Sequence, residues 1–341
     1  MKTFHRFSTL CILGISFLLY SSCTSRTNSN FYDQDFEDSI KKSFRVGSGG
    51  TLNIETDVGS IEVQADGGSQ VKVEVFRDVD ARSRGEIDDI LEDFAIDFDQ
   101  RDDDVFITGE WKDKSSRWWS RRRTRLKLRY VVSVPTRFNV DLQTSGGSIS
   151  VDDLEGKVNS KTSGGSLNFG DIKGPVHGRT SGGSITLEGC EGTANVRTSG
   201  GGIHIGEVDG DVEAHTSGGS ITIERANGEV NAGTSGGGIK VEEVMGAIEA
   251  TTSGGSVTAH ISQQPKGRCY LKTSGGSVKV YLAEDIGVDL DARTSGGHVE
   301  TDFPVTVQGK INKRSLQAEV NSGGPELILR TSGGSIYLRK M

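Results

Sequence analysis

The tetrapeptide Thr-Ser-Gly-Gly recurs through much of the chain at a nearly constant spacing, which limits the folds open to it. Copies begin at Thr144 and return every 18 residues as far as Thr252. Beyond that point the spacing lengthens, with copies at Thr273, Thr294 and Thr331 and the variant Asn321-Ser322-Gly323-Gly324. Such self-similarity, without apolar stretches of helix length, is typical of repeats that are stable only when stacked on one another.

Each repeat contains two short stretches in which apolar and polar residues alternate. Ile221 and Ile223 alternate in the first stretch of one repeat, and the smaller Val230 and Ala232 alternate in its second stretch. A period of two indicates strands with one buried face. The sequence therefore predicts an all-β, single-stranded β-solenoid, similar to a parallel β-helix, whose coils of 18 residues stack about 4.8 Å apart.

The glycines of the tetrapeptide are predicted to be structural turn residues. Because glycine adopts positive φ at little steric cost, each Gly-Gly pair is expected to form a tight corner. The preceding threonine points inward in this pattern, and we expect it to form a ladder against the backbone or neighbouring hydroxyl groups. The glycines concerned are Gly146, Gly147, Gly164, Gly165, Gly182, Gly183, Gly200, Gly201, Gly218, Gly219, Gly236, Gly237, Gly254 and Gly255.

The composition agrees with a thin repeat protein and argues against several other classes. Glycine accounts for 47 of 341 residues and aromatic residues for only 6%, too few for a large, irregular enzyme core. Collagen is excluded, because glycine does not recur at every third position and there are only 5 prolines. The net charge of −8 argues against a nucleic-acid partner, which would need a basic footprint.

No catalytic, cofactor or metal site is predicted. The sequence contains no Gly-x-Ser-x-Gly elbow, P-loop or His-Glu-x-x-His motif. His177, His204 and His215 fall on different outward columns, so we do not expect a zinc site. Acidic residues along one corner, from Asp152 to Glu243, are interpreted as a solvated edge, with weak cation binding as the alternative.

Two cysteines test the expected register. Cys190 and Cys269 both fall on inward positions, in coils four apart and therefore about 19 Å apart along the stack. A disulfide requires Cα atoms within about 7 Å of each other. We therefore expect two buried, unpaired thiols.

Residues 44–141 are predicted to form an N-terminal β region that begins and caps the stack. Ser83 and Glu86 form a capping box ahead of Ile87 and Ile90, which predicts one short cap helix over 83–94. Alternating apolar residues on both sides of Asp102-Asp103-Asp104 predict a hairpin. Residues 142–341 are then assigned to the Thr-Ser-Gly-Gly solenoid.

Residues 1–22 have the layout of a secretory signal peptide. Lys2 and Arg6 precede an apolar stretch of about ten residues, too short for a membrane core that needs about 20. Cys23 follows Ser21 and Ser22 in a stretch that resembles a relaxed bacterial lipobox. We expect Cys23 to be lipidated, with simple signal cleavage as the alternative, and residues 23–43 to form a flexible tether.

One segment is both basic and aromatic and is the candidate for membrane or partner binding. It contains Trp118, Trp119, Arg121, Arg122 and Arg123. Each cation gains about 1 kcal/mol near an anionic lipid surface. The alternative is a solvated hairpin whose tryptophans plug the cap.

The run Tyr130-Val131-Val132-Ser133-Val134-Pro135, followed by Thr-Ser-Gly-Gly-Ser repeats from Thr144, resembles the DUF4097 "putative adhesin" family. The resemblance covers about residues 44–341. It implies a bacterial envelope protein built from β-strand repeats. It says little about a binding site, because the repeated glycines only mark the corners of the coils. Related domains have also been proposed as extracytoplasmic parts of envelope-stress systems.

We therefore expect an exported, non-enzymatic lipoprotein of the cell envelope, placed at the outer membrane on its periplasmic or surface face. It would bind or scaffold through repetitive polar faces, and it would reach the membrane through the N-terminal lipid. Its partner would be an envelope glycan, a surface ligand or a membrane-associated protein. The alternative is an accessory or sensor domain of an envelope-stress system that contacts a membrane or a partner through the Trp/Arg segment.

Overall fold

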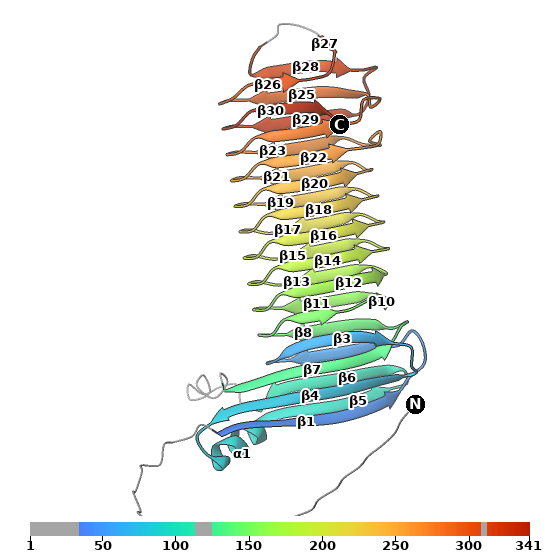
Figure 1. Cartoon of the computed structure of the whole chain (residues 1–341), viewed down its shortest axis with the longest axis vertical. Helices are drawn as coiled ribbons and strands as arrows, with labels where there is room; N and C mark the ends of the chain where they lie inside the picture. Colours follow the sequence, from blue (N-terminus) through green and yellow to red (C-terminus); the bar gives the residue numbers. More distant parts are fainter. Residues whose placement is uncertain (1–33, 113–124, 308–311) are drawn as a thin grey trace, which may run out of the picture. The chain divides into compact units, whose positions relative to one another are not determined.

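The structure is a computed structural model that describes residues 34–112, 125–307 and 312–341. The described strands form two sheets of fifteen strands each, sheet A and sheet B (Figure 1). Each repeat supplies one strand to each sheet and forms one coil of the stack. The chain is therefore nearly all β, as the alternating pattern predicts.

Within each sheet the strands follow one another in a fixed spatial order. Sheet A contains β1 (Gln34–Arg45), β4 (Gln70–Ala81), β7 (Leu126–Pro135), β3 (Ser60–Asp66), β9 (Ile149–Val151), β12 (Leu167–Lys173), β14 (Ile185–Cys190), β16 (Ile203–Val208), β18 (Ile221–Ala226), β20 (Ile239–Val244), β22 (Val257–Ile261), β24 (Val278–Leu282), β30 (Ile336–Lys340) and β26 (Val299–Thr301), with β10 (Leu154–Glu155) beside β12. Sheet B contains β5 (Phe94–Arg101), β6 (Asp104–Trp111), β2 (Thr51–Thr56), β8 (Asn139–Thr144), β11 (Val158–Thr162), β13 (Val176–Arg179), β15 (Ala194–Arg197), β17 (Val212–His215), β19 (Val230–Thr234), β21 (Ile248–Thr252), β23 (Cys269–Thr273), β29 (Glu326–Thr331), β25 (Val288–Thr294), β28 (Ser315–Val320) and β27 (Val305–Val307).

Neighbouring coils of the regular region pair in parallel with a shift of one repeat. In sheet A, Ile221 lies between Ile203 and Ile239 of the adjacent coils. In sheet B, Val212 lies opposite Val230 in the same way. Equivalent residues therefore form columns along the stack, and the predicted β-solenoid of repeated coils is confirmed.

The core between the sheets is a thin layer of interlocking apolar side chains. Ile221, Ile223 and Ala232 are at most 1% exposed. Small residues of sheet B make room for larger ones of sheet A: a Cβ added to Gly178 would lie 3.0 Å from Cε2 of Phe169. Because one coil alone would leave this layer open to water, burial on stacking supplies the main favourable free energy.

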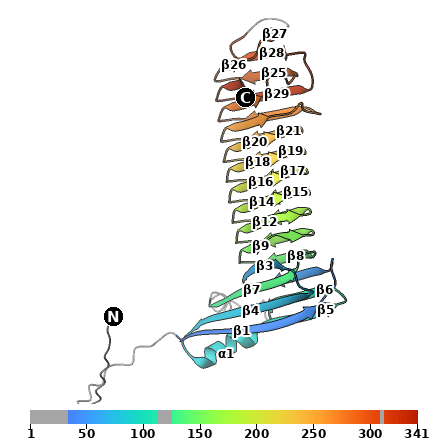
Figure 2. The same cartoon turned by 45° about the vertical axis from the view of Figure 1, so that its right-hand side comes forward.

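The repeated threonines form a ladder of hydrogen bonds along the corners that are aligned at one edge of the stack (Figure 2). Each threonine Oγ1 donates to the carbonyl oxygen of the glycine that ends the corner of the neighbouring coil. Thr216 donates to Gly201 at 2.8 Å, and Thr234 donates to Gly219 at 2.8 Å. Ten such bonds, all between 2.6 and 2.8 Å long, join the described coils. The expected threonine ladder is therefore confirmed, with backbone carbonyls as acceptors.

The Gly-Gly corners need glycine for a different reason from the one expected. None of the tetrapeptide glycines from Gly146 to Gly255 has φ in the left-handed region, so the expectation of positive φ is wrong. A Cβ on Gly201 would lie 2.3 Å from the carbonyl oxygen of Gly183, and a Cβ on Gly219 would lie 2.2 Å from that of Gly201. Glycine is required because the main chains of stacked coils approach too closely for a side chain.

At the C-terminal end, the order of the coils in space departs from their order in the sequence. Strand β29 lies between β23 and β25, and β30 lies between β24 and β26. The threonine ladder follows this spatial order, because Thr331 donates to Gly276 and Thr294 donates to Gly334. Beyond β24 the spatial order of the coils therefore differs from their order in the sequence, since similar tetrapeptide corners can stack on one another in either order.

Antiparallel strands complete both ends of the stack. At the N-terminal end β1 and β4 pair antiparallel, and so do β4 and β7 in sheet A and β5 and β6 in sheet B. The prediction of a flexible tether over 23–43 is therefore wrong for residues 34–43, because they belong to β1 and pair with β4. The hairpin of β5 and β6 turns where the three consecutive aspartates predict it. At the C-terminal end β25, β28 and β27 pair antiparallel. Strands β2 and β3 already form a coil of the stack, since Thr144 donates to the carbonyl oxygen of Gly59.

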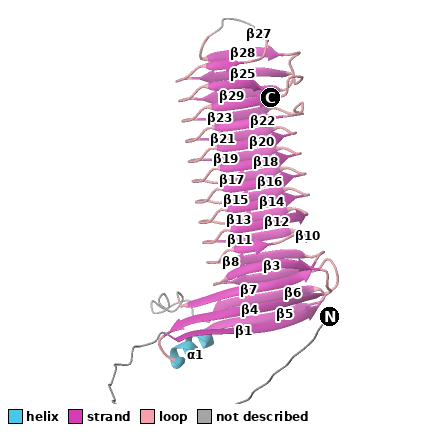
Figure 3. Ribbon diagram, viewed as in Figure 1, coloured by secondary structure: helices cyan, strands magenta, loops and turns pink. Residues whose placement is uncertain are grey.

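Helix α1 (Arg84–Asp93) lies at the N-terminal end of the stack (cyan in Figure 3). It starts after Ser83, whose Oγ accepts a hydrogen bond from the Glu86 N–H. Its buried residues Ile87 and Ile90 lie on the side that packs against β4 and β5. The helix therefore covers apolar residues where sheets A and B would otherwise open to solvent.

Both cysteines within the described residues are buried and unpaired. Cys190 lies at the end of β14, where its Sγ contacts the carbonyl oxygen of Gly174 at 3.2 Å. Cys269 begins β23 in the other sheet and is 1% exposed. Burial raises the pKa of both thiols. The prediction of two buried thiols without a disulfide is confirmed.

Gly146 and Gly147 allow a direct test of the close approach at the corners. A Cβ on Gly147 would lie 2.0 Å from the carbonyl oxygen of Gly59, whereas a Cβ on Gly146 would meet nothing within 4 Å. We expect Gly147→Ala to lower the free energy of unfolding by about 1–3 kcal/mol or more, and Gly146→Ala to change it little. Urea denaturation followed by circular dichroism measures both, and equal effects would contradict the steric account.

Replacing Thr216 tests the threonine ladder. Thr216→Val keeps the shape of the side chain but removes the hydroxyl that donates to Gly201, leaving a carbonyl at a buried corner without this donor. We expect a loss of about 1–3 kcal/mol in the free energy of unfolding. Thr216→Ser keeps the donor and serves as the control. If the serine variant lost as much stability as the valine variant, packing of the methyl group would account for the effect instead.

Candidate binding surfaces

Two faces of outward polar side chains run along the stack, one on each sheet. Side chains alternate along a strand, so every second residue of a coil points away from the core. One outward column of sheet A contains Ser150, Asn168, Thr186, His204, Thr222, Lys240 and Thr258. The comparable column of sheet B contains Asn159, His177, Asn195, Glu213, Asn231 and Glu249. Stacking thus brings together residues that are a whole repeat apart in the sequence.

The middle of the sheet B face is held together by contacts to one carboxylate. Glu213 accepts hydrogen bonds from Asn195 and Arg197, and His215 Nε2 lies 3.5 Å from it. These residues come from β15 and β17, which are adjacent. The polar groups of this part of sheet B therefore satisfy one another.

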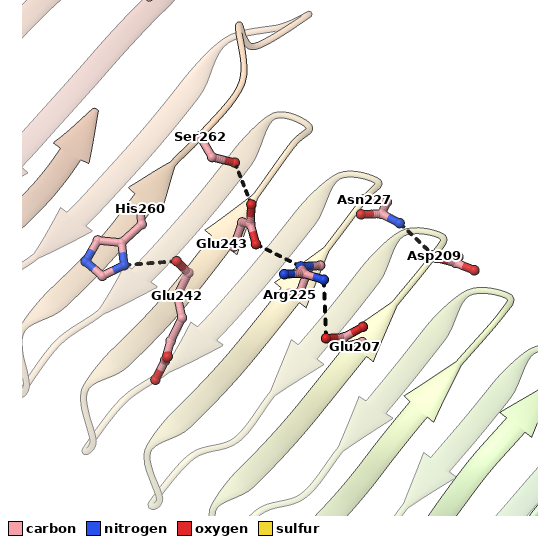
Figure 4. Close-up of polar contacts among 8 residues, drawn as sticks. All are labelled: Glu207, Asp209, Arg225, Asn227, Glu242, Glu243, His260 and Ser262. Carbon is pink, nitrogen blue, oxygen red and sulfur yellow. Dashed lines mark hydrogen bonds and ion pairs between the residues drawn. The ribbon is translucent and has the colours of Figure 1, made fainter. Parts of the chain in front are cut away.

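A charged ladder, meaning a row of paired side chains in neighbouring coils, runs along the C-terminal ends of the sheet A strands (Figure 4). Arg225 of β18 contacts the coils on both sides: its Nε donates to Glu243 at 2.7 Å, and its Nη1 lies 3.3 Å from Glu207. Ser262 extends the ladder by donating to Glu243 at 3.1 Å. Arg225 thus lies between two carboxylates, one in each neighbouring coil, and pairs with both.

Two further contacts join neighbouring coils along this edge (Figure 4). Asn227 Nδ2 donates to Asp209 at 2.8 Å. His260 Nδ1 lies 2.9 Å from the backbone carbonyl oxygen of Glu242. The acidic edge is therefore linked from coil to coil by side chains as well as by the backbone.

The hydrogen bonds along this edge shift the pKa values of the residues that form them. The hydrogen bond from Arg225 lowers the pKa of Glu243, and the hydrogen bond from Lys240 lowers the pKa of Glu242. In return, the hydrogen bond to Glu243 raises the pKa of Arg225. The folded state therefore favours the charged form of these carboxylates, and protonating them in acid removes that stabilisation.

An aromatic cluster faces outward on sheet A near its C-terminal end. The ring centroids of His260 and Tyr281 are 4.5 Å apart, and those of His298 and Tyr337 are 5.7 Å apart, both edge to face. The Arg339 guanidinium lies 5.1 Å from the Tyr337 ring centroid. This cluster was not predicted from the sequence, although the outward positions of Tyr281 and Tyr337 in their alternating strands could have indicated it.

Two shallow depressions adjoin on sheet A near the N-terminal end of the regular coils. Their volumes are ≈ 340 Å³ and ≈ 540 Å³. They share Gln64, Ser150, Asp152 and Asn168, so they form one hollow across β3, β9 and β12. A third depression of ≈ 410 Å³ lies on sheet B around Glu213. Further depressions of ≈ 460 Å³ and ≈ 360 Å³ lie near the two ends of the stack, around Asp291 and Arg77.

The predicted lipidation and binding residues are not in the described part of the chain. Those outside it are Cys23, Trp118, Trp119, Arg121, Arg122 and Arg123. The predicted turn glycines, by contrast, lie at the bends of the coils. Among the residues that the structure describes, no group of three or more histidine, cysteine, aspartate or glutamate side chains is placed to hold a metal ion.

The described flanks of the basic, aromatic segment are built into the fold. Trp111 is 1% exposed, and its ring lies edge to face with Phe94 at 5.0 Å. On the other flank, Arg125 pairs with Glu86 and Lys127 lies 3.3 Å from Asp78. Trp111 is thus buried in the N-terminal β region, and Arg125 and Lys127 each have an acidic partner.

A protein-family model matches most of this chain. The family model described as "Toastrack DUF4097" matches residues 50–339. The chain belongs to this family. The match covers the β-solenoid together with most of the described N-terminal strands, so the Toastrack DUF4097 family accounts for nearly all of the fold described above.

Several solved structures are similar to this Toastrack DUF4097 chain at low identity. A "putative adhesin" from Bacteroides fragilis is 13% identical, with a TM-score of 0.28, and the alignment covers 89% of this chain and 97% of that one. A "putative lipid binding protein" from Parabacteroides distasonis is 11% identical, with a TM-score of 0.31 and coverages of 88% and 96%. A "putative cell adhesion protein" from Clostridium sporogenes is 12% identical, with a TM-score of 0.20 and coverages of 89% and 100%.

No curated protein matches this sequence. Over the residues that the structure describes, no helix has both the length and the apolar character needed to cross a membrane.

Arg225→Gln tests the charged ladder. At pH 7 this variant leaves Glu207 and Glu243 without their shared cation, and we expect a lower melting temperature than that of the unmodified protein. The hydrogen-bonded Glu243 has a lowered pKa, so the contribution of Arg225 is present above about pH 4.5 and is lost as the pH falls further. The difference in melting temperature should therefore shrink at about pH 3.

Arg179→Gln is the matched control for this experiment. Arg179 lies at the end of β13 on sheet B and has no carboxylate partner among the described residues. We expect a small change in melting temperature that is the same at both pH values. An Arg225→Gln effect that stayed constant between the neutral and the acidic measurement would show that the ion pairs do not stabilise the fold.

Proposed function

We propose that this protein is a non-catalytic binding or scaffolding component of the bacterial cell envelope. In this proposal the N-terminal signal directs export, a lipid on Cys23 anchors the chain at the outer membrane, and the residues between Cys23 and β1 connect the anchor to the stack. The ligand is an envelope glycan, another surface ligand or a membrane-associated protein. The anchor and the export signal are supported by the sequence alone.

The observation that supports a binding role is the register of the outward columns. Ser150, Asn168 and Thr186 occupy one outward position of sheet A in three successive coils. Successive strands fix these groups about 4.8 Å apart. A surface that is already ordered loses little conformational freedom when it binds, which favours recognition of an extended ligand.

The geometry supports binding better than catalysis. A small-molecule site normally encloses most of its ligand between walls that carry convergent polar groups. In the described regular coils the corners are too short to build such walls, and the depressions are shallow. The acidic residues of the sheet A edge contact the cations and amides of neighbouring coils, as Glu243 contacts Arg225.

The alternative function is an accessory or sensor role at a membrane, performed by Trp118, Trp119 and the arginines that follow. The described flanks favour the first proposal, because Arg125 and Lys127 are engaged by Glu86 and Asp78. The two roles differ in their dependence on salt, because attraction to anionic lipid is screened at high ionic strength.

A sedimentation assay separates the two roles. Soluble protein beginning at Thr24 is mixed either with a purified cell-envelope fraction or with vesicles of phosphatidylglycerol and phosphatidylethanolamine. Each mixture is measured at about 50 and about 500 mM NaCl, between which the screening length changes about threefold. We expect retention on the envelope fraction at both salt concentrations. A variant with Arg121, Arg122 and Arg123 changed to Ser should be retained equally.

Two results would contradict the proposal. Failure of the unmodified protein to bind the envelope fraction would remove the binding role. Salt-sensitive binding to the vesicles that is lost in the triple-serine variant, without retention on the envelope fraction, would instead support the membrane-contacting role.

A further inference from the structure

The hollow on sheet A includes Gly170, a position without a side chain. Asp152, Gly170 and Glu188 are 18 residues apart and occupy the same outward position in three consecutive coils. A Cβ on Gly170 would lie 2.6 Å from Oδ1 of Asp153, which accepts a hydrogen bond from the Asp171 N–H. The Asp153 carboxylate therefore occupies the place that a side chain on Gly170 would take. Asp152 and Glu188 lie in the coils on either side, on strands about 10 Å apart.

A row of short polar side chains forms the adjoining part of the hollow. Ser150, Asn168 and Thr186 lie in register on β9, β12 and β14, and Gln64 of β3 completes the rim. Within the described part of the chain, these four side chains make no hydrogen bonds. Their donors and acceptors are therefore available to a ligand, unlike the amide of Asn195 on sheet B, which is bound to Glu213.

The charge of the lining restricts the ligand. Carboxylates and neutral polar groups line both depressions, whereas no lysine or arginine among the described residues does. Phosphates, sulfates and carboxylates would be repelled by Asp152 and Glu188. A neutral ligand rich in hydroxyl groups would donate to these carboxylates and would exchange hydrogen bonds with Ser150, Asn168 and Thr186.

We infer that this hollow binds a neutral oligosaccharide. The inference rests on the proposed function, because it names the ligand class and the face that would perform the binding. The sugar chain lies along the stack, where the row from Ser150 to Thr186 offers a contact at each strand spacing.

Asn159 provides a matched control on the opposite face. It lies on β11 of sheet B, in the strand between β9 and β12 along the chain. Like Asn168, it points outward and makes no side-chain hydrogen bond within the described residues. Removing either amide should leave the fold intact, so a difference in binding reports which face is used.

The test is isothermal titration calorimetry on soluble protein beginning at Thr24. The probes are cellohexaose, maltohexaose and hexa-N-acetylchitohexaose, with a heparin hexasaccharide as the anionic comparison. We expect at least one neutral hexasaccharide to bind, and Asn168→Ala to weaken its affinity about tenfold through the lost hydrogen bonds. Asn159→Ala should bind like the unmodified protein, and Ser150→Arg should abolish binding by filling the hollow. Circular dichroism confirms that each variant is folded.

Three results would overturn the inference: no neutral hexasaccharide binds, heparin binds more tightly than all of them, or Asn159→Ala and Asn168→Ala weaken binding equally. The same variants in the envelope sedimentation assay distinguish this failure from failure of the proposed function. Envelope retention without oligosaccharide binding would leave the proposed function standing and reject the sugar site. Loss of both would reject both.

Discussion

At the Gly-Gly corners, the main chain of one coil lies so close to the next that the space for a Cβ atom is already occupied by a carbonyl group. The Thr216 hydroxyl bonds to that carbonyl in Gly201, so the residues that permit the approach and the residue that stabilises it belong to one tetrapeptide. This contact fixes the position of each coil on its neighbour. Both sheets, the thin core and the outward columns follow from it.

The same register gives different parts of the sheet A face different chemistry. Where opposite charges recur in neighbouring coils, as with Glu207, Arg225 and Glu243, they pair and become part of the scaffold. Where the column carries short neutral groups beside a glycine, as around Gly170, nothing in the described structure pairs with them. Side chains are therefore available to a ligand where the pattern of paired charges is interrupted. The surrounding repeats hold those side chains in position.

The sequence was sufficient for those features that depend on local periodicity. The inward columns, the threonine ladder and the unpaired Cys190 and Cys269 all follow from counting positions within a repeat. The sequence did not reveal why the corners need glycine, because a positive φ and a close approach of two main chains both favour glycine. The contact of Asp153 with the backbone beside Gly170 was missed because it requires knowing that this carboxylate reaches into the next coil.

The spatial order of the coils was also beyond the sequence, since the corners that begin at Thr273, Thr294 and Thr331 are chemically alike. The observed order has a consequence for biosynthesis. Strands β25 and β26 leave the ribosome before β29 and β30, yet they rest on them in the finished stack. That end of the protein cannot be assembled progressively during translation or export. It must wait for residues 326–340, so a truncated chain would display an unfinished sheet edge by which quality-control proteases could recognise it.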